Sequence, residues 1–229
     1  MATRWSMAVF VCLAVVGMGR TASGISVAFS FSGSTGSEPS FAADGQPADA
    51  TVSPMSRGTG LTASAAANAF SSSGWTTAAV RDLNDYYTFT ITPDSGFGMS
   101  LTRLELDERR SLTGIREWSI YSSLDSFGIA LGTFSVDDND STRVNQGVNL
   151  GAPFANLTSS LEFRIYGFRS EAAGGTWRVD NVELSLTTFE LVPASVPESA
   201  STFSLLGLGL AGLAGFWRLG SYSRRAAAT

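Results

Sequence analysis

The chain has 229 residues, no histidine and one cysteine, Cys12, and all 15 of its basic residues are arginines. This composition excludes Ser-His-Asp and Cys-His catalysis, Schiff-base lysines and histidine-ligated zinc. Residues 25–194 contain ten arginines and 19 acidic residues, a net charge near −9 that argues against nucleic acids and anionic membrane surfaces as partners.

The N-terminus has the three parts of a secretory signal peptide. Arg4 supplies the positive charge, Met7–Met18 forms an apolar segment, and small residues lead up to Gly24. We therefore predict a signal helix over residues 1–24 that is cleaved after Gly24, with an uncleaved membrane anchor as the alternative. Because Cys12 lies within this segment, the exported part of the chain has no thiol for a disulfide or a metal site.

The region from 25 to 194 has the pattern of a series of short strands. Ile25–Phe31 alternates apolar with small or polar residues, which is typical of a half-buried strand. Residues 32–57 are rich in Gly, Ser, Ala, Asp and Pro and are predicted to form a long loop or an irregular excursion. Further strands are predicted over 86–92, 99–106, 115–121, 129–136, 161–167 and 177–186.

The last of these strands changes phase part of the way along. Trp177 and Val179 share one face, and after Asp180-Asn181 the apolar positions begin again at Val182. This shift predicts a β-bulge at Asp180-Asn181.

Seven or eight short strands, with turn residues between them and no helix outside the termini, predict an all-β domain over 25–194. We expect an antiparallel β-sandwich. A jelly-roll-like order is favoured because the first and last strands both look half-buried and could pair. A barrel is the alternative.

Acidic residues at two places in the chain are candidate Ca²⁺ ligands. The turn Asp137-Asp138-Asn139-Asp140 is dense in carboxylates, and Asp180 lies at the predicted bulge, where carbohydrate-binding jelly rolls often hold a structural Ca²⁺. The turn has neither the glycine nor the distal glutamate of an EF-hand loop. A solvated hairpin turn at Asp137, Asp138 and Asp140, and local hydrogen bonding at Asp180, are the favoured interpretations.

Several aromatic residues suggest a surface on which sugars stack. The set comprises Trp75, Trp118, Trp177, Tyr86, Tyr121 and Tyr166. Trp118 and Trp177 fall on the predicted inward faces and are expected in the core. Tyr166 falls on an outward face, so it is the candidate glycan-binding residue.

A charged segment follows the strand predicted over 99–106. Arg109 and Arg110 stand beside Glu105, Asp107 and Glu108. We expect a solvated hairpin that protects a sheet edge. A paired-carboxylate glycosidase site is the alternative, because that chemistry needs no histidine. No spacing marks such a pair, so no catalytic residue is assigned.

The C-terminal tail, residues 195–229, combines a turn, an apolar segment and a basic end. The apolar segment 203–219 has roughly the minimum length for a transmembrane helix. The arginines that follow it predict a cytoplasmic C-terminus. The turn and the basic end are formed by Val196, Pro197, Glu198, Ser201 and Thr202, and by Arg218, Arg224 and Arg225.

This order of parts resembles the PEP-CTERM sorting signal of exported bacterial proteins, although Ser199 stands where the family usually has proline. The resemblance implies processing by an exosortase, a membrane protease or transpeptidase, in a bacterium that makes extracellular polysaccharide. Residues 110–114, 121–127 and 175–182 also resemble a recurring cargo type of such proteins, which implies an exported β-sandwich and no specific activity.

Taken together, these features predict an exported, non-enzymatic protein of the cell surface or extracellular matrix. The tail would anchor it in the inner membrane until an exosortase-type enzyme processes it. No cofactor is expected apart from the candidate Ca²⁺. A module that binds the host's exopolysaccharide is the first alternative, and a histidine-free glycoside hydrolase or lyase is the second.

Overall fold

A computed structural model describes residues 24–192 of the chain. The predicted signal peptide, apart from Gly24, and the predicted sorting tail lie outside the described residues, and so does the transmembrane segment predicted over 203–219. Within 24–192, no helix combines the length and the hydropathy that crossing a membrane requires.

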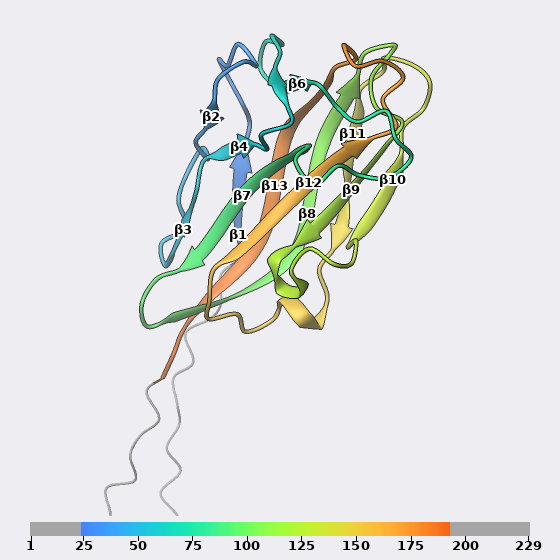
Figure 1. The fold of residues 1–229 in the computed structure, drawn as a ribbon. Coiled ribbons are helices and arrows are strands. Elements are labelled where there is room, and N and C mark those ends of the chain that lie inside the picture. Colours follow the sequence, from blue (N-terminus) through green and yellow to red (C-terminus); the bar gives the residue numbers. More distant parts are fainter. Residues whose placement is uncertain (1–23, 193–229) are drawn as a thin grey trace, which may run out of the picture. The chain divides into compact units, whose positions relative to one another are not determined.

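The described residues form two antiparallel β-sheets, as the all-β prediction expected (Figure 1). The first, sheet A, has the order β11 (Arg143–Asn149), β8 (Phe97–Arg110), β13 (Trp177–Glu190), β6 (Phe70–Ser73) and β5 (Thr62–Ala63), with β1 (Gly24–Phe29) also paired to β13. The second, sheet B, has the order β10 (Gly132–Ser135), β9 (Glu117–Ser122), β12 (Leu161–Phe168), β7 (Tyr86–Pro93), β4 (Met55–Arg57) and β2 (Ser40–Phe41), with β3 (Ala50–Val52) also paired to β7. Two short 3-10 helices, η1 (Ser123–Asp125) and η2 (Ala152–Phe154), lie in connections.

One hydrophobic core contains side chains from both sheets. Alternate residues of β7 and β12 enter it, as their period-two patterns predict, while the residues between them stay partly exposed over most of both strands. At one end the core is aromatic. The ring of Trp177 stacks on Tyr87 at 5.6 Å and meets Trp75 edge-on at 5.2 Å. Tyr87 also donates a hydrogen bond of 2.9 Å to the carbonyl of Trp177, so its buried hydroxyl is satisfied.

The predicted pairing of the first and last strands and the predicted bulge are both present. β1 runs antiparallel to β13, with Ile25 opposite Leu186. The register of β13 against β8 shifts between Asp180 and Glu183, and Asn181 takes a φ of 43°. The bulge therefore lets apolar residues on both sides of it enter the same core.

Some strands differ from the sequence prediction. β8 continues to Arg110 rather than ending at 106, and β10 is shorter than the predicted 129–136. The prediction of a single loop over 32–57 is wrong, because this stretch contains the short strands β2, β3 and β4. β6 and β11 were also missed.

Arg57 explains why the Gly- and Ser-rich stretch is ordered. Its guanidinium lies 3.6 Å from the ring centroid of Phe70 and donates to the carbonyls of Gly36 and Ser71 at 2.7 and 2.8 Å. One arginine thus ties three segments together that have little hydrophobic periodicity of their own.

Candidate functional site

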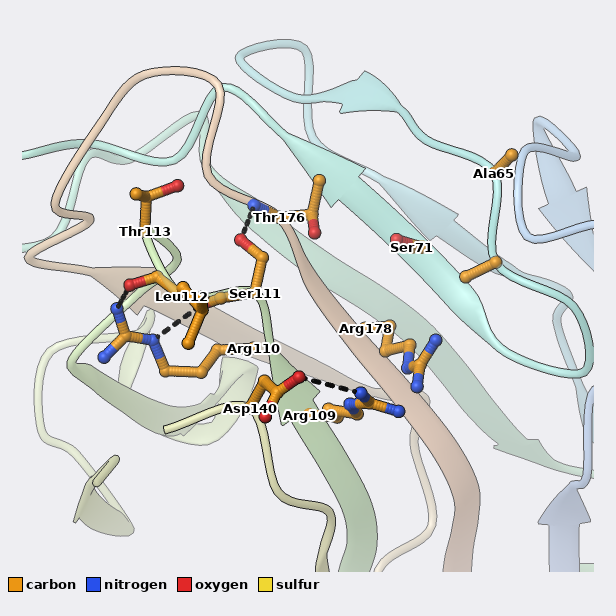
Figure 2. A pocket seen from close by; sticks show the side chains of 11 residues that line it. Ala65, Ser71, Arg109, Arg110, Ser111, Leu112, Thr113, Asp140, Thr176 and Arg178 are labelled. Carbon is orange, nitrogen blue, oxygen red and sulfur yellow. Dashed lines mark hydrogen bonds and ion pairs between the residues drawn. The ribbon is translucent and has the colours of Figure 1, made fainter. Parts of the chain in front are cut away.

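A cleft of about 460 Å³ lies over the outer face of sheet A, where β8 ends and β13 begins (Figure 2). This volume is within the range of roughly 300–1,000 Å³ that is common for small-molecule sites. We call it the sheet A cleft. It is lined by Ala65, Ala66, Ser71, Arg109, Arg110, Ser111, Leu112, Thr113, Asp140, Thr176 and Arg178. A smaller hollow of about 130 Å³ adjoins it, and Arg109 and Arg178 line both.

Strand register sets the floor of the cleft. Arg178 on β13 lies opposite Ser71 on β6 and opposite Arg109 on β8, so the three residues form one row across the sheet. The next row on the same face places Asp180 opposite Asp107. Two cations therefore face each other beside two anions that also face each other. Like charges in directly opposite positions destabilise a sheet.

The acidic row is satisfied mainly by hydrogen bonds. Asp107 accepts from the backbone N–H of Asn145 at 2.8 Å and from the side-chain amide of Asn181 at 2.9 Å. Asp180 accepts from the backbone N–H of Asn181 at 2.8 Å. Burial raises the pKa of Asp180, and the negative charge of Asp107 raises it further.

The basic row is less completely satisfied. Arg109 donates to Asp140 at 3.1 Å, and Figure 2 shows this contact at the edge of the cleft. The guanidinium of Arg178 makes no hydrogen bond or ion pair with any of the described residues. Burial lowers the pKa of Arg178, and the neighbouring charge of Arg109 lowers it further, although an arginine stays charged at neutral pH.

Hydroxyl-bearing side chains also line the cleft. Ser111 Oγ accepts a bond of 2.9 Å from the backbone N–H of Thr176, which leaves its own proton free to donate. Ser71, Thr113 and Thr176 add three further hydroxyls to the lining. The cleft thus presents charged and neutral donors to any molecule that enters it.

Arg110 fixes the wall of the cleft from beneath. Its side chain is fully buried, and it donates to the carbonyls of Ser111 and Leu112 at 2.9 and 2.7 Å, as Figure 2 shows. It also pairs with Asp138 at 3.1 Å and with Glu171 at 2.7 Å. Four acceptors from three segments therefore converge on one guanidinium and hold the 111–113 loop in place.

The prediction of a solvated hairpin is wrong for Arg110 and for Glu108. Glu108 is also buried, and it accepts a 2.7 Å bond from Trp177 Nε1 while pairing with Arg143. Both side chains point inward because β8 continues past the predicted end, which carries them between the sheets. The surrounding donors and acceptors then offset the cost of burying their charges.

The four candidate Ca²⁺ ligands do not come together. Asp138 pairs with Arg110 and with Arg116, Asp140 pairs with Arg109, and Asp180 lies in the other row of the sheet. Among residues 24–192, no three acidic side chains converge as a metal site would require. The turn that contains Asp137, Asp138 and Asp140 instead supplies carboxylates to neighbouring arginines.

Tyr166 as the glycan-binding residue would need an accessible ring, and the structure does not provide one. Its side chain is fully buried, and its ring packs against Tyr86 at 5.3 Å and Tyr121 at 5.4 Å. The guanidinium of Arg81 lies 3.5 Å from the ring centroid of Tyr121 and 4.7 Å from that of Tyr166. Tyr166 does lie on the outer face of sheet B, but the segment that contains Arg81 covers it. It therefore offers no open ring face to a sugar. Trp118 and Trp177 are buried as predicted.

The charged segment contains no free pair of carboxylates. Glu105 bonds to Arg103 at 2.6 Å, and both Asp107 and Glu108 already accept the hydrogen bonds described above. The cleft residues Arg178, Thr176, Ser111 and Thr113 were not identified from the sequence. Alternation about Trp177 does place Arg178 on the outward face, but sequence alone could not show that it faces Arg109.

No protein-family model and no curated protein matches the chain. Solved structures align with it at low identity. A mutant of a family 29 carbohydrate-binding module is 16% identical with a TM-score of 0.36, over 72% of this chain and 92% of that chain. The K1 cleaved adhesin domain of Lys-gingipain from Porphyromonas gingivalis W83 is 14% identical with a TM-score of 0.37, over 70% of this chain and 97% of that chain. Similarity at this level assigns no function to the present chain.

Proposed function

We propose that this protein is an exported, non-enzymatic binding protein that holds extracellular polysaccharide in the sheet A cleft. The observation that carries the proposal is the lining of the cleft, which combines the guanidinium groups of Arg109 and Arg178 with four hydroxyl-bearing residues on a rigid floor. Sugars present many hydroxyl groups, and polar side chains fixed by strands can hydrogen-bond them with little loss of entropy on binding.

The rigidity of the floor supports binding at this place. Arg109 and Arg178 belong to paired strands, and Arg110 donates two hydrogen bonds to the adjoining 111–113 loop while Asp138 and Glu171 fix its guanidinium. A site built in this way does not need to order a loop before it binds, which lowers the entropic cost of association.

The route of export remains the one that the sequence predicts. In this proposal the signal peptide directs the chain across the membrane, and the PEP-CTERM-like tail holds it there until an exosortase-type enzyme processes it. Intact mass spectrometry of the protein from its host tests this part. We expect a species that begins near Ile25 and ends close to Pro197 outside the membrane fraction. If every species retains Arg224 and Arg225, the tail is a plain anchor and the sorting proposal fails.

The binding proposal is tested by filling the cleft. Ala65 is exposed at the edge of the cleft, so Ala65→Trp should occupy it without disturbing the core. Ala155→Trp is the matched control, because Ala155 is also exposed but does not line the cleft. Binding of neutral and acidic oligosaccharides to the full chain is measured by calorimetry in a polyoxyethylene detergent, since detergents with sugar headgroups would compete.

We expect Ala65→Trp to weaken binding at least tenfold and Ala155→Trp to leave it unchanged. Equal affinity of both variants would show that the cleft is not the site. If no oligosaccharide of the panel binds the full chain, the proposed function is refuted.

A further inference from the structure

Arg178 stands apart from the other arginines of the described chain. The guanidinium of each of the others donates at least one hydrogen bond to a carboxylate, a carbonyl or a hydroxyl, whereas that of Arg178 donates none within residues 24–192. Its neighbours in the row across the sheet are a serine and a second arginine. A partly buried cation without a partner is unfavourable, so a bound anion would relieve an existing cost.

Among the described residues, one carboxylate, that of Asp140, forms an ion pair with this row of arginines, and that ion pair is weak. Asp140 contacts Arg109 and not Arg178, and 56% of its side chain is exposed. An exposed ion pair of this kind contributes roughly 0–1 kcal/mol. Arg109 can therefore exchange Asp140 for another anion at small cost, which would leave both guanidinium groups facing the same ligand.

The geometry of the row suits an oxyanion. A guanidinium presents its N–H groups as a planar fork that matches the oxygens of a carboxylate or a sulfate. Ser111, Thr113 and Thr176 place hydroxyls in the same cleft, where they can bind the hydroxyls of an attached sugar. The net charge near −9 over residues 25–194 rules out non-specific attraction of polyanions, so such a ligand would have to be held locally.

We propose that the sheet A cleft recognises the anionic substituent of an acidic polysaccharide, with Arg178 as the primary contact and Arg109 as the second. The substituent is the carboxylate of a uronic acid or a sulfate ester. Asp140 acts as a built-in competitor that occupies Arg109 when no ligand is bound. This inference rests on the proposed function and specifies its ligand.

The test measures binding of four probes to the full chain in a polyoxyethylene detergent. The acidic probes are alginate hexasaccharide, which carries carboxylates, and κ-carrageenan hexasaccharide, which carries sulfates. Their neutral counterparts are the carboxyl-reduced alginate and the desulfated carrageenan. We expect at least one acidic probe to bind ten times or more tighter than its neutral counterpart. Whichever acidic probe is preferred identifies the substituent.

Four variants connect that preference to the residues. Arg178→Ala should weaken binding of the acidic probe at least tenfold, and Arg178→Lys, which keeps the charge but loses the fork, should weaken it less. Asp140→Asn should strengthen binding several-fold, a gain that misfolding cannot produce. Arg103→Ala is the control. Arg103 lies on the outer face of β8, the strand that also contains Arg109, but it is bound to Glu105 and does not line the cleft.

The outcomes separate the two proposals. Binding of neutral and acidic probes with equal affinity would overturn the anion site but leave polysaccharide binding intact. The same conclusion follows if acidic probes bind and Arg178→Ala has no effect. If none of the four probes binds, both proposals fail.

Discussion

Replacing Glu108 by alanine removes the acceptor that holds two buried donors at the aromatic end of the core. Trp177 Nε1 donates to Glu108 at 2.7 Å, and Arg143 pairs with the same carboxylate. The side chain of Glu108 is 1% exposed and that of Arg143 is 15% exposed, so water has little access to either group. The variant therefore leaves a partly buried cation and a buried indole N–H without their partner.

The expected loss follows from these two effects. Removing one member of a buried ion pair costs about 3–5 kcal/mol, and an unsatisfied buried donor costs about 1–3 kcal/mol. The two effects share one carboxylate and are not additive, so we expect Glu108→Ala to lower the free energy of unfolding by about 3–5 kcal/mol. Small domains have about 5–15 kcal/mol in total, so this loss is a large fraction of their stability.

Urea unfolding followed by tryptophan fluorescence measures the effect, because Trp177 lies at the perturbed site. Glu105→Gln is the control on the same strand, since Glu105 faces outward and forms a surface ion pair with Arg103 that contributes roughly 0–1 kcal/mol. The double variant Glu108→Leu/Arg143→Met should be more stable than the summed losses of the single variants Glu108→Leu and Arg143→Met predict, because it leaves no unpaired charge. A loss below about 1 kcal/mol for Glu108→Ala would refute the argument that this buried pair is coupled.

Three further predictions concern single positions. Gly175→Ala should lose about 1–3 kcal/mol of stability, because a methyl group there overlaps the carbonyl of Thr113. Gly174 has open space around it, so the control Gly174→Ala should change stability by less than about 0.5 kcal/mol. Equal denaturation midpoints for the two variants would contradict this prediction. Folding raises the pKa of Asp180, so the folded state binds the proton of this carboxyl more tightly than the unfolded state does. The side chain therefore adds stability when it is protonated, below its unfolded pKa of about 3.9, and this stability is lost as the pH rises through the folded pKa. Asp180→Asn should therefore be more stable than the native chain at pH 7 and lose that advantage near pH 3; a difference that does not vary with pH would exclude the effect. Tyr166→Phe should cost less than about 1 kcal/mol in thermal unfolding, since the buried hydroxyl has no hydrogen-bond partner among the described residues, and a larger loss would mean that the hydroxyl is bound.

Hydrophobic alternation identified most of the longer strands. Tyr87 and Phe163 lie in the core because each belongs to a stretch in which every second residue is apolar. The bulge at Asp180-Asn181 was visible in the same way, since the phase of the pattern changes there. Alternation failed for β2 to β6, which have few apolar residues and are ordered by contacts such as those of Arg57.

The candidate site was much less accessible from the sequence. Arg178 can be placed on an outward face from its neighbours in the chain, but the sequence does not show that Arg109 lies opposite it or that no carboxylate of residues 24–192 forms an ion pair with its guanidinium. For Tyr166 the sequence overestimated accessibility. This residue also lies on an outward face, but Arg81, a residue 85 positions earlier in the chain, covers it.

By itself the sequence determined the all-β class, the inward residues of the regular strands and the position of the bulge, because these depend on a period of two within a single strand. It also determined which chemistries are excluded, since a missing histidine or lysine cannot be supplied by folding. Only the tertiary structure decided that Glu108 and Arg110 are buried and that Arg178 faces another arginine. These properties depend on the register between strands far apart in the chain, and no local pattern encodes which residue will lie opposite which.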